Sequence, residues 1–229
     1  ILDAALHVAS LTGGVFDPTV QPVWHLYCAH FTRREADPAG PPPAAVAEAL
    51  DRVGHRYLRV GPDTILFARR GMAVTLNGIA QGYITDRVVD LLREEGIGHT
   101  LVDMGEARAL GTQSAVRPWR AALADPVGPE RPWKTLDLVD RALASSGDDG
   151  FVFDVTGRFT HLLHPRTGLS PRRYRAVSVL APEATTADAL STAFALLPED
   201  MIASTLVGLP TVEAHLLRHD GSEVALRGG

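Results

Sequence analysis

The amino-acid sequence predicts a mixed α+β fold in which antiparallel hairpins are flanked by helices. Short β-branched segments, of which 176–180 is the clearest, alternate with longer amphipathic ones, and no repeat period is apparent. The chain has 229 residues, 45% of them hydrophobic and 21% charged, which is typical of a globular protein with a sizeable core. We therefore expect a single domain over residues 1–229.

The expected helices are marked by apolar periodicity and by end signals. Residues 1–11 form an amphipathic pattern that stops at Thr12-Gly13-Gly14, a helix-stop signal. Residues 36–43 are rich in Ala, Pro and Gly and predict a surface loop. The other helices are expected at 22–31, 44–52 and 186–197.

The expected strands are short and lie between turn signals. Residues 57–60 and 64–67 flank the Gly61-Pro62-Asp63 turn and predict a hairpin. Residues 136–139 and 142–145 are expected to pair with each other. The remaining candidates are 100–103, 107–110, 119–123, 151–153, 160–163, 176–180, and then 205–207, 213–217 and 224–226 as strands or a mixture of strand and helix.

Composition excludes several classes of function. A net charge of −5 without a run of Lys or Arg argues against nucleic-acid binding. Cys28 is the only cysteine, so the chain has no internal disulfide and no cysteine metal cluster. No stretch reaches the roughly 18 apolar residues of a membrane span. The chain opens with Ile1 inside a helical pattern, so we expect a fragment or processed product that lacks any targeting segment.

The most informative segment runs from Thr75 to Arg87. An apolar run at 73–76 stops at Asn77-Gly78, and an amphipathic pattern follows Gly82, which predicts a strand, a small-residue turn and a helix. Such a turn presents backbone groups at a helix N-terminus, where they can hold a phosphate or lend a carbonyl to a metal. Glycine-bearing turns of this kind are also common as purely structural connections.

Asp188 and Thr192 stand four residues apart in a predicted helix, so their side chains share one face. A carboxylate and a hydroxyl suit a hard cation such as Mg²⁺, which takes only one or two protein carboxylates. The alternative is structural: Thr186 caps the helix, Asp188 lies in its favourable first turn and Thr192 is half-buried. The spacing alone favours the structural interpretation.

Two histidines lie near a Pro-Arg-Thr-Gly turn. His161 and His164 end a short predicted strand, where an imidazole can act as acid, base or phosphate contact, although either can equally be a hydrogen-bonded surface residue. The segments 103–106 and 145–148 place Gly and oxygen-bearing side chains after strands. An ordinary turn is the default interpretation of both.

Taken in order, these segments resemble the ApbE family of FAD:protein FMN transferases. The family pattern runs Phe-Asp-Pro-Thr-Val, Asp-Leu-Gly-Gly-Ile-Ala-Lys-Gly-Tyr, Leu-Gly-Gly, Thr-Ser-Gly, His-Ile-Ile-Asp-Pro-Arg-Thr-Gly and Ala-Asp-Ala-Leu-Ala-Thr-Ala. The matching segments here are 16–20, 75–83, 102–106, 145–147, 161–168 and 187–193. Because they span nearly the whole chain in the expected order, six weak motifs make one strong signal. The amino-acid sequence at 76–83 and 102–106 is most similar to that of the NosX-type branch, which serves maturation of the nitrous oxide reduction system.

The resemblance implies an ApbE-like, T-fold-related domain whose N-terminal part is missing here. Such a protein binds FAD and Mg²⁺ and moves FMN onto a Ser or Thr hydroxyl of an acceptor protein, releasing AMP. The metal ligands carried over are the Asp188 carboxylate, the Thr192 hydroxyl and the Gly78 carbonyl. His161 matches the family histidine proposed to help activate the acceptor hydroxyl. The flavin-binding positions carried over are Phe16, Asp17, Thr75, Gln81 and Leu162.

The resemblance also implies a periplasmic location and a NosR-like membrane protein as acceptor. Three departures from the family pattern remove charge: Thr75 replaces Asp, Gln81 replaces Lys, and His164 replaces the Asp before Pro-Arg-Thr-Gly. We expect these three departures to affect metal affinity more than flavin binding. Two alternatives to transfer are therefore kept, a flavin-binding accessory protein whose site does not turn over and a pyrophosphatase that hydrolyses FAD to FMN and AMP.

Overall fold

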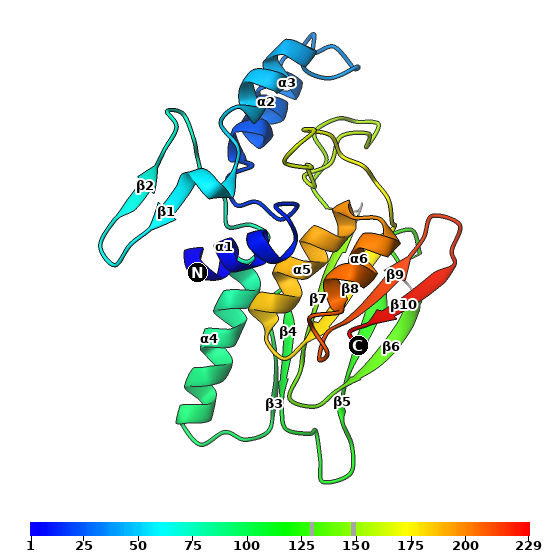
Figure 1. Ribbon diagram of the computed structural model, residues 1–229. Coiled ribbons are helices and arrows are strands. Elements are labelled where there is room, and N and C mark those ends of the chain that lie inside the picture. Colours follow the sequence, from blue (N-terminus) through cyan, green and yellow to red (C-terminus); the bar gives the residue numbers. More distant parts are fainter. Residues whose placement is uncertain (129–130, 148–149) are drawn as a thin grey trace. The chain divides into compact units, whose positions relative to one another are not determined.

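The computed structural model describes residues 1–128, 131–147 and 150–229 (Figure 1). The chain divides into two compact units, each described here by itself. The larger unit contains residue 1 together with 77–148 and 173–229, and the smaller contains 2–76 and 149–172. The expectation of a single domain stays a prediction.

The larger unit is built on antiparallel sheets. Its strands span Thr100–Asp103 (β3), Ala107–Leu110 (β4), Trp119–Ala124 (β5), Pro132–Leu138 (β6), Ala142–Gly147 (β7), Ala176–Ala181 (β8), Glu213–Leu217 (β9) and Glu223–Arg227 (β10). Six of them form one sheet in the order β10-β9-β8-β7-β4-β3, and β5 pairs with β6 in a separate two-stranded sheet. Every pairing is antiparallel, which agrees with the α+β prediction.

Three helices accompany these sheets: Ala80–Glu94 (α4), Ala184–Leu196 (α5) and Glu199–Leu206 (α6). Helix α5 packs on β7 and β8 and also against α4 (Figure 1). It is buried on almost every side, with Leu190 and Phe194 fully enclosed, as is typical of a helix inside a core. Strand β8 is likewise buried along its whole length. The core of the unit therefore lies between α5 and the centre of the sheet.

The smaller unit contains Leu2–Leu11 (α1), Gln21–Phe31 (α2), Pro43–Leu50 (α3), a 3₁₀ turn at His55–Tyr57 and a hairpin of Leu58–Val60 (β1) with Ile65–Phe67 (β2). Its core is aromatic. Tyr27 lies with its ring centroid 5.3 Å from that of Phe159 and 5.6 Å from that of Phe153. The predicted helices and this hairpin are therefore confirmed, with boundaries shifted by a residue or two.

The predicted pairing of 136–139 with 142–145 is wrong. Strand β6 pairs with β5, and β7 pairs with β4 and β8. Between them the chain turns at Asp140, which has a φ of 49° and accepts a hydrogen bond from the Gly111 amide at 2.8 Å. That turn moves the chain from one sheet to the other. Alternating side chains specify a strand but not its partner.

Other predicted strands are also wrong. Residues 73–76 form no strand, because the Thr75 N–H donates to the Pro18 carbonyl of a loop at 2.8 Å. Residues 205–207, predicted as a strand or as part of a mixture of strand and helix, take the helical alternative: they overlap the end of α6, whose buried Ile202 and Leu206 are four residues apart, as a helix requires. The two candidates at 151–153 and 160–163 form only an isolated bridge between Val152 and Thr160. No helix in the described parts of the chain is long and apolar enough to cross a membrane.

Candidate functional site

The helix predicted after the 75–83 turn and the predicted helix that carries Asp188 meet inside the larger unit. Gly82, in the first turn of α4, packs directly against α5. A Cβ placed on Gly82 would lie 2.2 Å from the Ala184 carbonyl oxygen and 2.8 Å from the Asp188 Cβ. The two helices therefore approach at a separation that only glycine permits.

The close approach brings the Asp188 carboxylate against the start of α4. Asp188 is only 4% exposed, and its Oδ2 accepts a hydrogen bond of 2.9 Å from the Gly82 backbone N–H. Burial raises the pKa of the Asp188 carboxyl to about 6, although the Gly82 hydrogen bond lowers it. Among the described residues, no Lys, Arg or His forms an ion pair with Asp188. Its negative charge is therefore buried against the dipole of the Gly82 backbone N–H.

Glu106 is the residue of this site that sequence reasoning missed. It follows β3 in the segment 103–106, for which the sequence favours an ordinary turn over loop chemistry, and it is only 7% exposed. Burial, and then the negative charge of Asp188, raise the pKa of Glu106 to about 8, whereas a hydrogen bond from the Ser145 backbone lowers it. Two carboxyl groups thus share one buried region of low polarity, where ionising both is unfavourable. The signal in the sequence that could have indicated Glu106 is its position directly after the turn glycine Gly105.

Gln81 lies against the same loop. Gly105 has a φ of 102°, and a Cβ there would lie 2.5 Å from the Gln81 Nε2 atom. The loop is further held by the Thr85 hydroxyl, which donates to the Glu106 carbonyl at 3.3 Å. The structure therefore brings Gln81, Glu106 and Asp188 to one place, on α4, the β3–β4 loop and α5.

The two other predicted metal ligands of this unit, Gly78 and Thr192, come shortly before Gln81 and shortly after Asp188 in sequence. Gly78 lies in the turn 77–79 that leads into α4, and it is half-buried. Thr192 is half-buried one helical turn beyond Asp188 on α5. Thr186, the alternative cap, is not the N-cap, because α5 begins at Ala184. The Gly78 and Thr192 assignments as ligands stay predictions.

The other predicted residues belong to the smaller unit. The Asp17 carboxylate accepts hydrogen bonds from the Thr19 N–H at 2.9 Å and hydroxyl at 2.6 Å, and from the His55 N–H at 2.8 Å. It thereby holds the loop after α1 in place. Phe16 and Leu162 are buried, and Thr75 is half-buried. Their flavin contacts stay predictions.

His161 is half-buried and held by the backbone of residue 151. Its N–H donates to the Phe151 carbonyl at 2.9 Å, and its ring Nδ1 lies 3.1 Å from the same oxygen. Because a carbonyl can only accept, Nδ1 carries the hydrogen in the neutral ring, and Nε2 has the free lone pair. The ring is also packed tightly, since a Cβ on Gly150 would lie 2.1 Å from its Cε1 atom. Asp148, at the end of the predicted 145–148 turn, lies outside the described residues, and 145–147 belong to β7.

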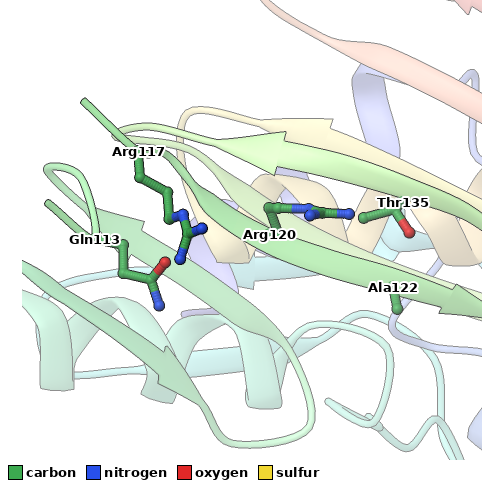
Figure 2. A pocket seen from close by; sticks show the side chains of 5 residues that line it. All are labelled: Gln113, Arg117, Arg120, Ala122 and Thr135. Atoms are coloured by element: carbon green, nitrogen blue, oxygen red, sulfur yellow. The ribbon is translucent and has the colours of Figure 1, made fainter.

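A separate hollow of about 370 Å³ lies on the β5–β6 hairpin and the loop before it. Figure 2 shows Gln113, Arg117, Arg120, Ala122 and Thr135 around it. None of these residues is among the predicted site residues. The hollow is therefore distinct from the acidic pair on α5 and the β3–β4 loop.

The donor set around Asp188 suits a hard cation. No group of three or more His, Cys, Asp or Glu side chains in the described parts of the chain could hold a metal ion. Mg²⁺ does not require such a group, because one or two carboxylates suffice when carbonyls, hydroxyls, waters and phosphates complete its octahedron. Asp188 and the neighbouring Glu106 supply that number of carboxyl groups.

Fold and site together define an α+β protein with a buried pair of carboxyl groups at a glycine-tight contact between two helices. Comparison with known proteins shows which family this protein belongs to. The chain belongs to the ApbE family, whose family model matches residues 1–216.

Named relatives and solved structures agree with this assignment. The chain is 33% identical to a FAD:protein FMN transferase of Treponema pallidum over 93% of its own length and 63% of that protein. It is 32% identical to one of Haemophilus influenzae, over 87% and 60%. The chain thus spans about three fifths of the length of these relatives. The ApbE protein of Thermotoga maritima superposes with a TM-score of 0.85 at 29% identity, covering 99% of this chain and 74% of that one. The flavin transferase ApbE of Vibrio cholerae does so with 0.77 at 28%, over 98% and 72%.

Proposed function

We propose that this chain acts as a Mg²⁺-dependent FAD:protein FMN transferase. The observation that carries the proposal is the buried Asp188, which shares its surroundings with Glu106 and has no ion-pair partner among the described residues. An uncompensated buried carboxylate is unfavourable unless a cation neutralises it. The names of the relatives supply the reaction in which such a cation would serve.

In this reaction an acceptor Ser or Thr oxygen attacks the phosphorus of the FMN half of FAD. The new P–O bond joins FMN to the acceptor, and the pyrophosphate P–O bond breaks so that AMP leaves. A bound Mg²⁺ would supply neutralisation of the pyrophosphate charge. Asp188, Thr192 and the Gly78 carbonyl are the groups that would hold the cation, and the Glu106 carboxyl would add a further oxygen nearby.

His161 is the group that we assign to the acceptor's proton. A Ser or Thr hydroxyl is a weak nucleophile until a base accepts its hydrogen. The Phe151 carbonyl orients His161 so that Nε2 has the lone pair and can accept that proton. The same nitrogen can later release the proton to solvent. We assign flavin contacts to Phe16, Asp17, Thr75, Gln81 and Leu162.

The biological setting is a further proposal. The wording of residues 76–83 and 102–106 is similar to that of the NosX-type branch, which suggests maturation of nitrous oxide reductase. A NosR-like protein would then be the acceptor, and the periplasm would be the compartment. Flavinylation of such an acceptor by the purified chain, and not of an unrelated protein, would support this setting.

The test is to incubate the protein with FAD, Mg²⁺ and an acceptor peptide and to examine peptide and flavin by mass spectrometry. A peptide heavier by one FMN supports the transferase. Free FMN with AMP and an unmodified peptide identifies a pyrophosphatase instead. Intact FAD bound to the protein identifies an accessory protein, a result that the neutral residues Thr75, Gln81 and His164 would then explain.

A further inference from the structure

A second contact between α4 and α5 lies one helical turn from the Gly82–Asp188 hydrogen bond. Asp86 Oδ1 accepts a hydrogen bond from the Ala184 N–H at 2.8 Å. Its Oδ2 accepts one from the Thr185 N–H at 2.8 Å and another from the Thr185 hydroxyl. The carboxylate of α4 thus caps the first turn of α5, where helix N–H groups otherwise have no partner.

The cap is supplied from outside the helix that it caps. The N-cap position of α5 is Glu183, whose side chain makes no capping hydrogen bond. The negative charge of Asp86 also lies at the positive end of the helix dipole, which adds a favourable electrostatic interaction. Asp86 therefore supplies both the capping hydrogen bonds and the favourable negative charge that residues at the helix's own N-terminus usually supply.

Arg108 on β4 completes this cap. Its Nη1 donates to Asp86 Oδ1 at 2.6 Å, and the two side chains are only 11% and 6% exposed. The ion pair neutralises the Asp86 charge, and it ties α4 to the sheet that carries the Glu106 loop. One buried carboxylate is thus in contact with α5 and β4.

The two contacts define a register between antiparallel helices. Gly82 lies opposite Asp188, and four residues further along α4 Asp86 lies opposite Ala184, four residues earlier on α5. A helix repeats its facing positions about every four residues, so the contacts lie on one seam. If the cap were lost, α5 could slide or rotate against α4, and the Gly82–Asp188 hydrogen bond would be the first to change.

We propose that Asp86 is a positioning residue for the cation site: by capping α5 from α4 it sets the register that holds Asp188 against Gly82. Both of its carboxylate oxygens are engaged by Arg108 and the start of α5, so we assign it no contact with cation or substrate. Its effect reaches the site through the backbone of α5, which carries Asp188 and Thr192 together. This inference rests on the proposed function, because the cation site itself belongs to that proposal.

The experiment compares Asp86→Asn with Asp90→Asn, which removes a carboxylate one turn further along the same helix. Asp90 Oδ1 lies 3.9 Å from Arg108 Nη1, and in the described parts of the chain no hydrogen bond joins its side chain to the first turn of α5. Hydrogen-exchange mass spectrometry of peptides covering 78–86 and 182–190 reports the register without any cation. Calorimetric titration with MgCl₂ alone reports the site.

We expect Asp86→Asn to speed exchange in both peptides by roughly tenfold, which corresponds to the loss of one charge-assisted hydrogen bond. Its Mg²⁺ affinity should fall on the order of tenfold, as when other groups that orient metal ligands are removed. Asp90→Asn should change neither. If Asp86→Asn does not fold, Thr185→Val provides the same comparison, because it removes only the hydroxyl donor, and it should show both effects at smaller size.

Two results would overturn the inference. One is unchanged exchange in Asp86→Asn or Thr185→Val. The other is faster exchange with an unchanged Mg²⁺ affinity, which would make Asp86 a structural cap only. A wild-type protein that binds no Mg²⁺ would instead contradict the cation site of the proposed function, and the exchange data would still decide whether Asp86 sets the register.

Discussion

The Gly82 backbone N–H donates a hydrogen bond of 2.9 Å to the Asp188 carboxylate, across a contact too close for any side chain on Gly82. The start of α4 and the Asp188 position of α5 are therefore parts of one arrangement, although about a hundred residues separate them in sequence. Tight backbone packing holds the acid in a buried place, where its charge has large energetic effects.

Replacement of Gly82 by alanine should destabilise the protein. The added Cβ would meet the Ala184 carbonyl at 2.2 Å, and backbone cannot move aside as a flexible side chain can. We expect the free energy of unfolding to fall by about 1–3 kcal/mol, as for other overpacked cores. Urea denaturation measures this. Gly98→Ala is the control, since nothing lies within 4 Å of a Cβ there. Equal stability of the two variants would contradict the close contact.

Stability of the metal-free protein should depend on pH through Glu106. Its pKa is raised from 4.5 to about 8 in the folded protein. Between these two pH values the folded state therefore holds a proton that the unfolded state has released. The stability that this proton contributes is fully present below pH 4.5 and is lost as the pH rises through about 8.

Glu106→Gln keeps the shape of the side chain but cannot ionise. We expect it to match the wild type near pH 4 and to be more stable by a few kcal/mol near pH 9. Thermal unfolding at several pH values measures the difference. Glu94→Gln, an exposed change on α4, should show no such trend. A constant difference between wild type and Glu106→Gln across this range would refute the raised pKa.

Asp188→Ala should abolish Mg²⁺-dependent turnover and leave the fold largely intact, because it removes the proposed charged ligand and relieves an unfavourable buried charge. Flavin transfer to the acceptor peptide, followed by mass spectrometry, measures turnover, and circular dichroism reports the fold. Asp90→Asn is the control, since its half-exposed carboxylate pairs with Arg87 and Arg93 and lies outside the site. Wild-type activity in Asp188→Ala would remove the metal assignment.

His161→Ala should lose transfer while FAD binding is retained, because we assign this side chain a proton and not the flavin. Flavin fluorescence measures binding, and mass spectrometry of the peptide measures transfer. His25→Ala, an exposed histidine of the same unit, should keep both. If His161→Ala no longer binds FAD, the histidine is a ligand contact and the base must be sought elsewhere.

Arg108→Met should be strongly destabilising, because it leaves the Asp86 carboxylate buried without its ion-pair partner. Removal of one member of a buried pair costs about 3–5 kcal/mol. Arg93→Met is the matched control. Half-exposed Arg93 lies 3.6 Å from Asp90 near the surface, where an ion pair contributes roughly 0–1 kcal/mol. Urea denaturation of both variants tests the contrast, and similar losses would show that burial does not matter here.

Local sequence was sufficient for most of the secondary structure. The periodicity of 1–11 and the apolar run of 176–180 predicted α1 and β8, because each pattern reflects one element's own buried face. The partner of 136–139 could not be inferred in the same way. Its alternation is compatible with pairing to either neighbour, and the turn at Asp140 decided between them.

By itself, the sequence determined the α+β class, the four-residue spacing of Asp188 and Thr192 on one helical face, and the order of motifs that marks the ApbE family. Only the tertiary structure decided that Glu106 is buried beside Asp188 and that Asp86 caps α5. The physical reason is separation along the chain. Burial and mutual repulsion of two carboxyls depend on distances in space, and those distances arise only when α4, α5 and the β3–β4 loop have packed together.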